Sequence, residues 1–269
     1  MSLRKAFLPL LIFGTTGVAA ADPGDLQERV DSTEDVTIGL LRDGAYIMTA
    51  PLRPTKKGLL ITFATLGAGA AIMGFDRHIS NSVQHSKHRG LKKIFKGLDE
   101  DEGIERFGRS SGVMMTCAAF YGGGILTHSP KAKRVAFIGV EAWLYNDTVS
   151  KLFKAGLGRA RPGARDPYDF DSFSGKSSLP SGHTSTAFCL ATVISSEYKS
   201  GLVATAAYGT ATMVGFSRLY RDVHWASDVV VSAVLGVAIG KATHDLYGTN
   251  PRNWEIILDG QGAKVSRKF

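Results

Sequence analysis

The sequence has little cysteine. Two residues, Cys117 and Cys189, occur in 269. They are too few for a disulfide framework, so we expect two buried thiols, although an oxidising compartment would also allow them to pair. The chain has no cysteine and histidine spacing typical of a zinc module, and no basic helix with interleaved aromatic residues. These absences argue against nucleic acid as a partner.

Acidic residues are also in short supply. Lys and Arg number 32 against 24 Asp and Glu, which gives a formal net charge of +8. This excess favours anionic partners such as phosphate esters or anionic lipids. The acidic run at 99–102 lacks the glycine-spaced pattern of a calcium loop, so we expect no metal site there. The basic stretch at 87–93 is either a solvated helix face or a contact with an anionic membrane surface.

Long apolar runs are nearly absent from the helical part of the chain. The mean hydropathy is only +0.01, and just two segments, 59–75 and 229–240, approach the roughly 20 residues that a membrane span prefers. The positive-inside rule would place the basic residues 53–57 in the cytoplasm, whereas a cleaved export signal would leave them outside. We therefore favour a soluble periplasmic bundle that contacts a membrane, and an integral membrane protein remains the alternative.

The N-terminus predicts export. Arg4 and Lys5 form a basic start, an apolar stretch extends from residue 6 to about 18, and small residues follow. This order is typical of a secretory signal peptide, which we assign to residues 1–21. An uncleaved anchor is the alternative, but the apolar stretch is short for one.

The rest of the chain predicts an all-α helical bundle. Strand-type alternation is absent, and apolar helical segments are joined by short connections, with one long loop at 162–180. A short helix is expected within residues 31–51. The six longer helices are expected at 58–75, 108–127, 133–156, 181–198, 200–217 and 223–246. We divide the mature chain into a polar segment at 22–57, a helical domain at 58–248 and a basic tail at 249–269.

Three short segments carry residues suited to phosphate chemistry. Two cations seven residues apart share a helix face, a histidine follows a glycine at a helix start, and a second histidine has a carboxylate four residues later. Singly, each has an ordinary structural explanation as a helix end, a cap or a hydrogen bond. Their occurrence together and in order is the informative feature. The segments are Lys154-x6-Arg161-Pro162, Pro180-Ser181-Gly182-His183 and Ser217-Arg218-x5-His224-x3-Asp228.

This combination resembles the three-part motif of the type 2 phosphatidic acid phosphatase and vanadium haloperoxidase superfamily, K-x6-RP, PSGH and SR-x5-H-x3-D. Every fixed position matches. The resemblance implies that His224 is the nucleophile, that Asp228 orients it and that His183 protonates the leaving group. It implies that Lys154, Arg161, Ser181, Gly182 and Arg218 bind the phosphate. It further implies no metal or other cofactor, with vanadate acting as an inhibitory phosphate mimic.

The substrate class remains open at the level of sequence. A lipid phosphate such as phosphatidic acid, phosphatidylglycerol phosphate or undecaprenyl diphosphate fits the apolar helices and basic stretch. A broad-specificity periplasmic acid phosphatase, a haloperoxidase and a non-catalytic anion-binding module are the alternatives. In the 162–180 loop, Tyr168, Phe170 and Phe173 either contact the leaving group or pack within the loop.

Overall fold

The computed structural model describes residues 36–88, 103–249, 253–259 and 262–268. The expected signal peptide, the acidic run at 99–102 and the side chains of the basic stretch lie outside this part. The elements are α3 (Val36–Met48), η1 (Ala50–Leu52), α4 (Lys56–Met73), α5 (Asp76–His88), η3 (Ile104–Gly108), α7 (Ser110–Leu126), α8 (Pro130–Leu157), η4 (Pro162–Ala164), α9 (Gly182–Tyr198), α10 (Gly201–Tyr220), α11 (Ala226–Thr249), β1 (Asn253–Asp259) and β2 (Gly262–Lys268).

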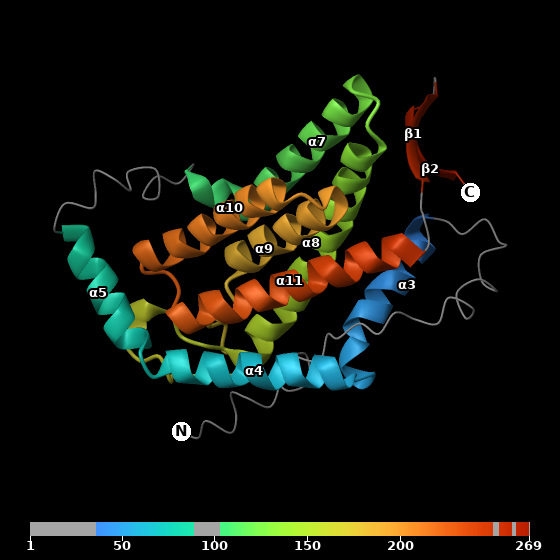
Figure 1. Cartoon of the computed structure of the whole chain (residues 1–269). Coiled ribbons are helices and arrows are strands. Elements are labelled where there is room, and N and C mark those ends of the chain that lie inside the picture. The colour runs from blue at the N-terminus through green and yellow to red at the C-terminus, as the bar shows by residue number, and fades with distance from the viewer. Residues whose placement is uncertain (1–35, 89–102, 250–252, 260–261, 269) are drawn as a thin grey trace.

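The helical bundle expected from the sequence is confirmed. Helix α9 lies at its centre and packs against α8, α10 and α11 (Figure 1). Helix α7 runs along α8, and α4 lies along α11. All six longer expected helices are present, with ends within a few residues of those predicted. The apolar faces of these helices meet in one main core, which includes Ile138, Tyr145 and Ile239.

Two glycines on α11 allow it to lie directly against α9. A Cβ at Gly236 would lie 2.1 Å from the carbonyl oxygen of Ser185, and one at Gly240 would lie 2.5 Å from that of Cys189. Since neither distance leaves room for a side chain, the two backbones touch at successive turns. This contact fixes the start of α9, which bears one motif histidine, relative to the start of α11, which bears the other.

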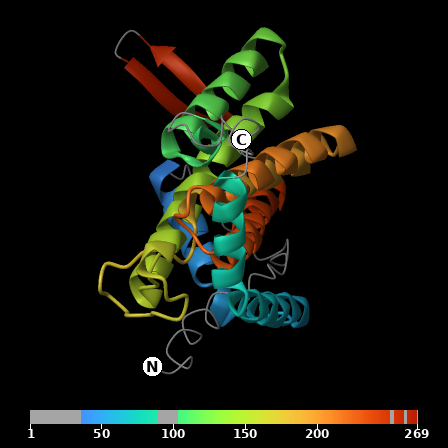
Figure 2. The ribbon, with the colours of Figure 1, turned by 90° about the vertical axis from the view of Figure 1, so that its left-hand side faces the viewer.

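The short helix expected within residues 31–51 is present as α3, whereas the C-terminal end of the described chain differs from the tail expected from sequence. Helix α3, within the expected polar segment 22–57, contributes Ile47 to the main core, and the Tyr145 hydroxyl donates a hydrogen bond to the Leu40 carbonyl. At the C-terminus, β1 and β2 form an antiparallel hairpin in which Asn253 pairs with Lys268. Figure 2 shows this hairpin at the same end of the molecule as the turn between α7 and α8.

Both cysteines are buried free thiols, as expected. Burial raises the pKa of Cys117 to about 12, so this thiol stays protonated at physiological pH.

Helices α4 and α11 are the two described helices that are long and apolar enough to cross a membrane, judged by length and composition. They contain the two segments identified from hydropathy. Only 28% of the α4 window is buried inside the structure, against 50% for α11. The outer face of α4 therefore presents large apolar side chains, including Leu60 and Phe63.

Candidate active site

The two motif histidines stand at neighbouring helix starts. His183 is in the first turn of α9, and His224 lies in the turn that precedes α11. His224 is only 5% exposed. The Nε2 atom of His183 is buried and has no hydrogen-bond partner among the described residues. A buried ring nitrogen without a partner is available for proton transfer to a bound molecule.

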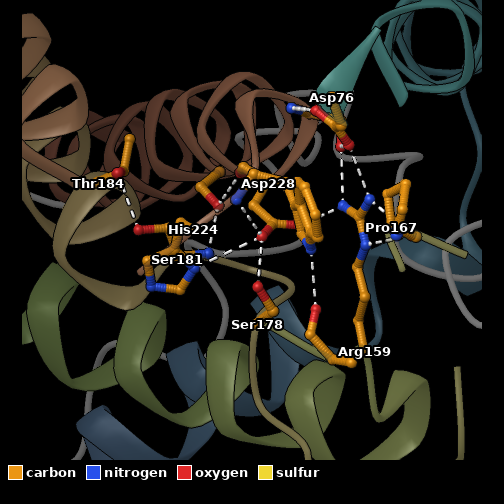
Figure 3. Close-up of polar contacts among 12 residues, drawn as sticks. Asp76, Arg159, Pro167, Ser178, Ser181, Thr184, His224 and Asp228 are labelled. Atoms are coloured by element: carbon orange, nitrogen blue, oxygen red, sulfur yellow. Dashed lines mark hydrogen bonds and ion pairs between the residues drawn. The ribbon is translucent and has the colours of Figure 1, made fainter. Parts of the chain in front are cut away.

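The carboxylate of Asp228 lies beside the His224 ring (Figure 3). Its Oδ2 atom is 3.5 Å from His224 Nδ1, a long contact, and accepts hydrogen bonds from the Ser178 hydroxyl at 2.6 Å and the Trp225 backbone N–H at 3.0 Å. Burial has the largest single effect and would raise the pKa of Asp228, but Arg159, His224 and Ser178 together outweigh it and the pKa is lowered. An ionised carboxylate facing Nδ1 favours a proton on that atom and leaves the lone pair on Nε2.

Two motif cations act on the histidines electrostatically. Burial lowers the pKa of Lys154, and the charge of Arg161 lowers it further. Burial also lowers the pKa of His224; Asp228 opposes this, whereas Arg161 and Lys154 add to it. The structure thus brings Lys154, near the end of α8, and Arg161, in the loop just after it, into range of His224. A cationic pocket beside a neutral imidazole suits a phosphate dianion.

The pKa of His183 is lowered to about 4. Burial is the largest cause, followed by the positive charges of His224, Arg109, Lys154 and Arg221. The dipole of α9 also disfavours a positive charge at the helix start, but burial and the neighbouring cations are the causes of the lowered pKa. His183 is therefore neutral at pH 7 in the unliganded protein, and a bound anion would raise its pKa.

The start of α9 forms one wall of the site. Ser181 is fully buried; its backbone N–H donates to the Ser232 hydroxyl at 2.6 Å, and its Oγ lies 2.9 Å from Thr184 Oγ1. The bond to Ser232 holds the helix start against α11, and the contact with Thr184 lies within the first turn of α9. A Cβ at Gly182 would meet only Lys154 Nζ, at 3.4 Å. The missing side chain therefore leaves space beside the ammonium group where an anion can approach the helix N-terminus.

Arg218 is the motif cation whose side chain is held by a residue that sequence reasoning missed. Glu105, in η3, is 1% exposed and forms an ion pair with Arg218. It also accepts hydrogen bonds from Arg109 at 2.5 Å and Arg221 at 2.7 Å. The Arg218 carbonyl accepts a bond from the Val223 N–H, next to His224. Glu105 belongs to no motif, so the sequence offers no signal for its role.

Among the described residues, no group of three or more His, Cys, Asp or Glu side chains is placed to hold a metal ion.

Comparison with known proteins finds a family model that matches the segment containing this site. Residues 135–252, which contain all three motifs, match the family model of the PAP2 superfamily. The match covers less than half of the chain.

Two individual proteins resemble the chain. A lipid A 1-phosphatase of Porphyromonas gingivalis (strain ATCC 33277) is 38% identical over 110 residues, which are 39% of this chain and 23% of that protein. The chain thus matches about a quarter of that relative's length. A crystal structure of a transmembrane PAP2-type phosphatidylglycerolphosphate phosphatase from Bacillus subtilis is 20% identical, with a TM-score of 0.49. That comparison covers 80% of this chain and 94% of the other.

The first motif contains a second residue that sequence reasoning missed. Arg159 occupies one of its variable positions and is 0% exposed. Its Nη2 donates to Asp76 at 2.7 Å, its Nη1 donates to the Asp228 carboxylate, and its Nε donates to the Pro167 carbonyl at 3.0 Å. The seven-residue spacing identifies Lys154 and Arg161 as cations on one face. Arg159, which lies between them in the sequence, is the cation of this segment that is fully buried.

The long loop at 162–180 is folded around Arg159. Gly158 has φ +56°, and a Cβ there would lie 1.7 Å from the Asp171 carbonyl oxygen, so only glycine permits this turn out of α8. Phe170 is buried in the main core, with its ring centroid 5.3 Å from the Arg159 guanidinium. Tyr168 and Phe173 are exposed. Of the three aromatic candidates, Phe170 therefore packs within the protein, and the other two are accessible to a ligand.

Proposed function

We propose that this protein is a metal-independent phosphatase that cleaves a lipid phosphate through a phosphohistidine intermediate. The single observation that supports it best is the pairing of His224 with the ionised Asp228, next to Lys154 and Arg161. This combination provides an oriented nucleophile and a cationic site for the group it attacks. Positioning and neutralisation of charge are the main requirements of phosphoryl transfer.

In the first step, the His224 Nε2 lone pair attacks phosphorus, and the bond from phosphorus to the ester oxygen breaks. His183 supplies a proton to that oxygen, so the leaving group departs as an alcohol, or as a phosphate if the substrate is a diphosphate. Asp228 faces Nδ1 and stabilises the positive charge that develops on the ring. Lys154, Arg161 and Arg218 stabilise the charge on the equatorial oxygens, and the Gly182 backbone N–H provides a further hydrogen bond. Ser181, whose N–H is bonded to Ser232, holds this helix start in place instead of binding the phosphate directly.

In the second step, water replaces the leaving group. His183, now neutral, accepts a proton from the water as its oxygen attacks phosphorus. The P–N bond breaks, the electron pair returns to His224, and inorganic phosphate is released. Vanadate should bind in the same pocket as a mimic of the five-coordinate transition state and inhibit.

The lipid class is supported by the outer surface and by the relatives. Leu60 and Phe63 on α4, and Met115 and Leu126 on α7, are large apolar side chains exposed outside the core. Large apolar side chains exposed on these two helices favour contact with lipid. The named activities of the two similar proteins are lipid A 1-phosphatase and phosphatidylglycerolphosphate phosphatase. Export to the periplasm remains part of this proposal.

Two other functions make different predictions. A broad-specificity acid phosphatase would hydrolyse small aryl phosphates as fast as lipid phosphates, with no dependence on detergent. A haloperoxidase would oxidise halide with vanadate and peroxide and would lack phosphatase activity.

A substrate panel with and without detergent tests the proposal. It should include phosphatidic acid, phosphatidylglycerol phosphate, undecaprenyl diphosphate, lipid A and a small aryl phosphate. Phosphate release should be fastest on one of the lipids, should persist in EDTA and should fall on the order of 1,000-fold or more in His224→Ala. His85→Ala, a histidine exposed on α5, is the matched control and should keep full activity. Equal activity of the two variants would contradict the assigned nucleophile.

A further inference from the structure

The carboxylate of Asp228, which faces His224, is linked to a second buried carboxylate on α5, a helix far away in the sequence. Asp76 is the first residue of α5 and lies 152 positions before Asp228 in the chain. Arg159 bridges the two, since Nη2 bonds Asp76 and Nη1 bonds Asp228. All three side chains are 0% exposed (Figure 3). Asp76 also lies outside residues 135–252, the part that matches the PAP2 family.

The bridge is anchored at several points. Asp76 accepts hydrogen bonds from the Ser227 backbone N–H at 2.9 Å and the Ser227 hydroxyl at 2.5 Å. The same hydroxyl accepts a bond from Arg159 at 2.7 Å. Ser227 directly precedes Asp228, so Asp76 holds the backbone at the first turn of α11. A shift of Asp76 would therefore move both the guanidinium and the helix turn that carry Asp228.

The balance of charge suggests why a second carboxylate is needed. Within this contact, two carboxylates share one guanidinium. If Asp228 were the sole partner of Arg159, the pair would have no net charge. Little negative charge would then be available to stabilise a positively charged His224 ring. With Asp76 present, the three groups carry a net negative charge on the side where Asp228 meets Nδ1. In a buried site such charges are weakly screened.

We infer that Asp76 is a positioning residue for the His224 nucleophile, acting through Arg159 and Ser227 on Asp228. Its negative charge balances that of Arg159, so that the charge of Asp228 remains available to stabilise a positively charged imidazole. This role deepens the proposed function, since a ring that becomes positively charged during phosphoryl transfer gains most from it. Asp76 touches neither the phosphate pocket nor the leaving group in this assignment. Its removal should therefore affect the chemical step more than substrate binding.

The test compares Asp76→Asn with Asp222→Asn in the full-length protein. Asp222 is the matched control because it also ties α5 to the bundle, by accepting a 2.6 Å bond from Ser80, but has no contact with Arg159. Asp76→Asn should lower kcat about 10- to 100-fold with little change in KM, whereas Asp222→Asn should change neither. The pKa of His224, followed in the pH profile, should fall further in Asp76→Asn because Lys154 and Arg161 then act with less opposition.

A spectroscopic measurement separates this inference from the proposed function. Nitrogen NMR of histidine-labelled protein, with His224 assigned through its substitution, reports its tautomer and pKa without any substrate. Asp76→Asn should reduce the Nδ1–H tautomer or lower the pKa, and Ser227→Ala should do so to a smaller extent if Asp76→Asn fails to fold. An unchanged His224 signal in folded variants would overturn the inference even if the protein is a phosphatase. A changed signal in a protein without phosphatase activity would support it and reject the proposed function.

Discussion

The ammonium nitrogen of Lys154 lies 3.4 Å from the point where a side chain on Gly182 would begin. Lys154 is near the end of α8, and Gly182 is the first residue of α9. The first and second motifs therefore meet at this point, which we assign to the bound phosphate.

Gly182→Ala should weaken phosphate binding while the protein remains folded. The added methyl group meets only the flexible end of Lys154, so it costs little in the empty site. It occupies space that a phosphate oxygen needs next to the helix N-terminus. We expect the inhibition constant of vanadate to rise about 10-fold or more. Gly201→Ala is the control, since Gly201 is the first residue of α10 and nothing lies within 4 Å of its Cβ position; equal inhibition constants in the two variants would argue against this placement.

The need for His183 should depend on the leaving group. An alkyl alcohol leaves poorly without a proton, whereas p-nitrophenolate leaves without one. His183→Ala should therefore slow the first step about 100-fold or more on an alkyl phosphate and much less on p-nitrophenyl phosphate. Because His183 also activates the water, the variant should release a burst of p-nitrophenol and then stall as phosphoenzyme. Equal losses on both esters, with no burst, would remove His183 from the role of proton donor.

The pKa of His183 determines a difference between two pH profiles. In the free protein this pKa is about 4, and kcat/KM reports the free protein. Only the protonated form of His183 can donate a proton to the leaving group. We therefore expect kcat/KM to fall as the pH rises past the pKa of His183 in the free protein, which is about 4. A bound phosphate dianion raises the pKa of His183, so the fall in kcat should occur at higher pH. The lowered pKa of His224 keeps this nucleophile neutral down to acid pH.

Profiles measured with two esters whose phosphate groups ionise at different pH values provide the check. The alkaline fall in kcat should stay at the same pH for both esters. If it follows the ionisation of the ester instead, His183 does not control it.

Gly158→Ala should destabilise the fold and disturb the site together. The residue has φ +56°, and its added Cβ would collide with the Asp171 carbonyl oxygen. We expect the free energy of unfolding to fall by about 1–3 kcal/mol or more, measured by denaturant unfolding. Gly163→Ala, in the same loop but with nothing near its Cβ position, should change stability little. Similar stability of both variants would contradict the tight turn.

Local signals in the sequence predicted most of the helices and the motif residues of the site. Helix α9 was predicted within a residue because Pro180 and Gly182 mark its start, and the motif residues were found because their spacing is short and specific. Asp76 and Arg159 were not paired because they lie 83 positions apart and a buried ion pair leaves no periodic pattern. Glu105 was missed for the same reason. The C-terminal hairpin did have a signal, since the two residues between the paired positions Asp259 and Gly262 begin with a glycine, which is common in two-residue hairpin turns. The basic residues around it suggested a tail.

The central claim is that His224 becomes phosphorylated. Rapid mixing of the protein with labelled substrate, followed by an alkaline quench and peptide mapping, measures this directly. The account predicts label on the peptide that contains His224, sensitivity of that label to acid, its accumulation in His183→Ala and its absence in His224→Ala. Normal turnover of wild-type protein with no label on His224 in either wild-type protein or His183→Ala would contradict it.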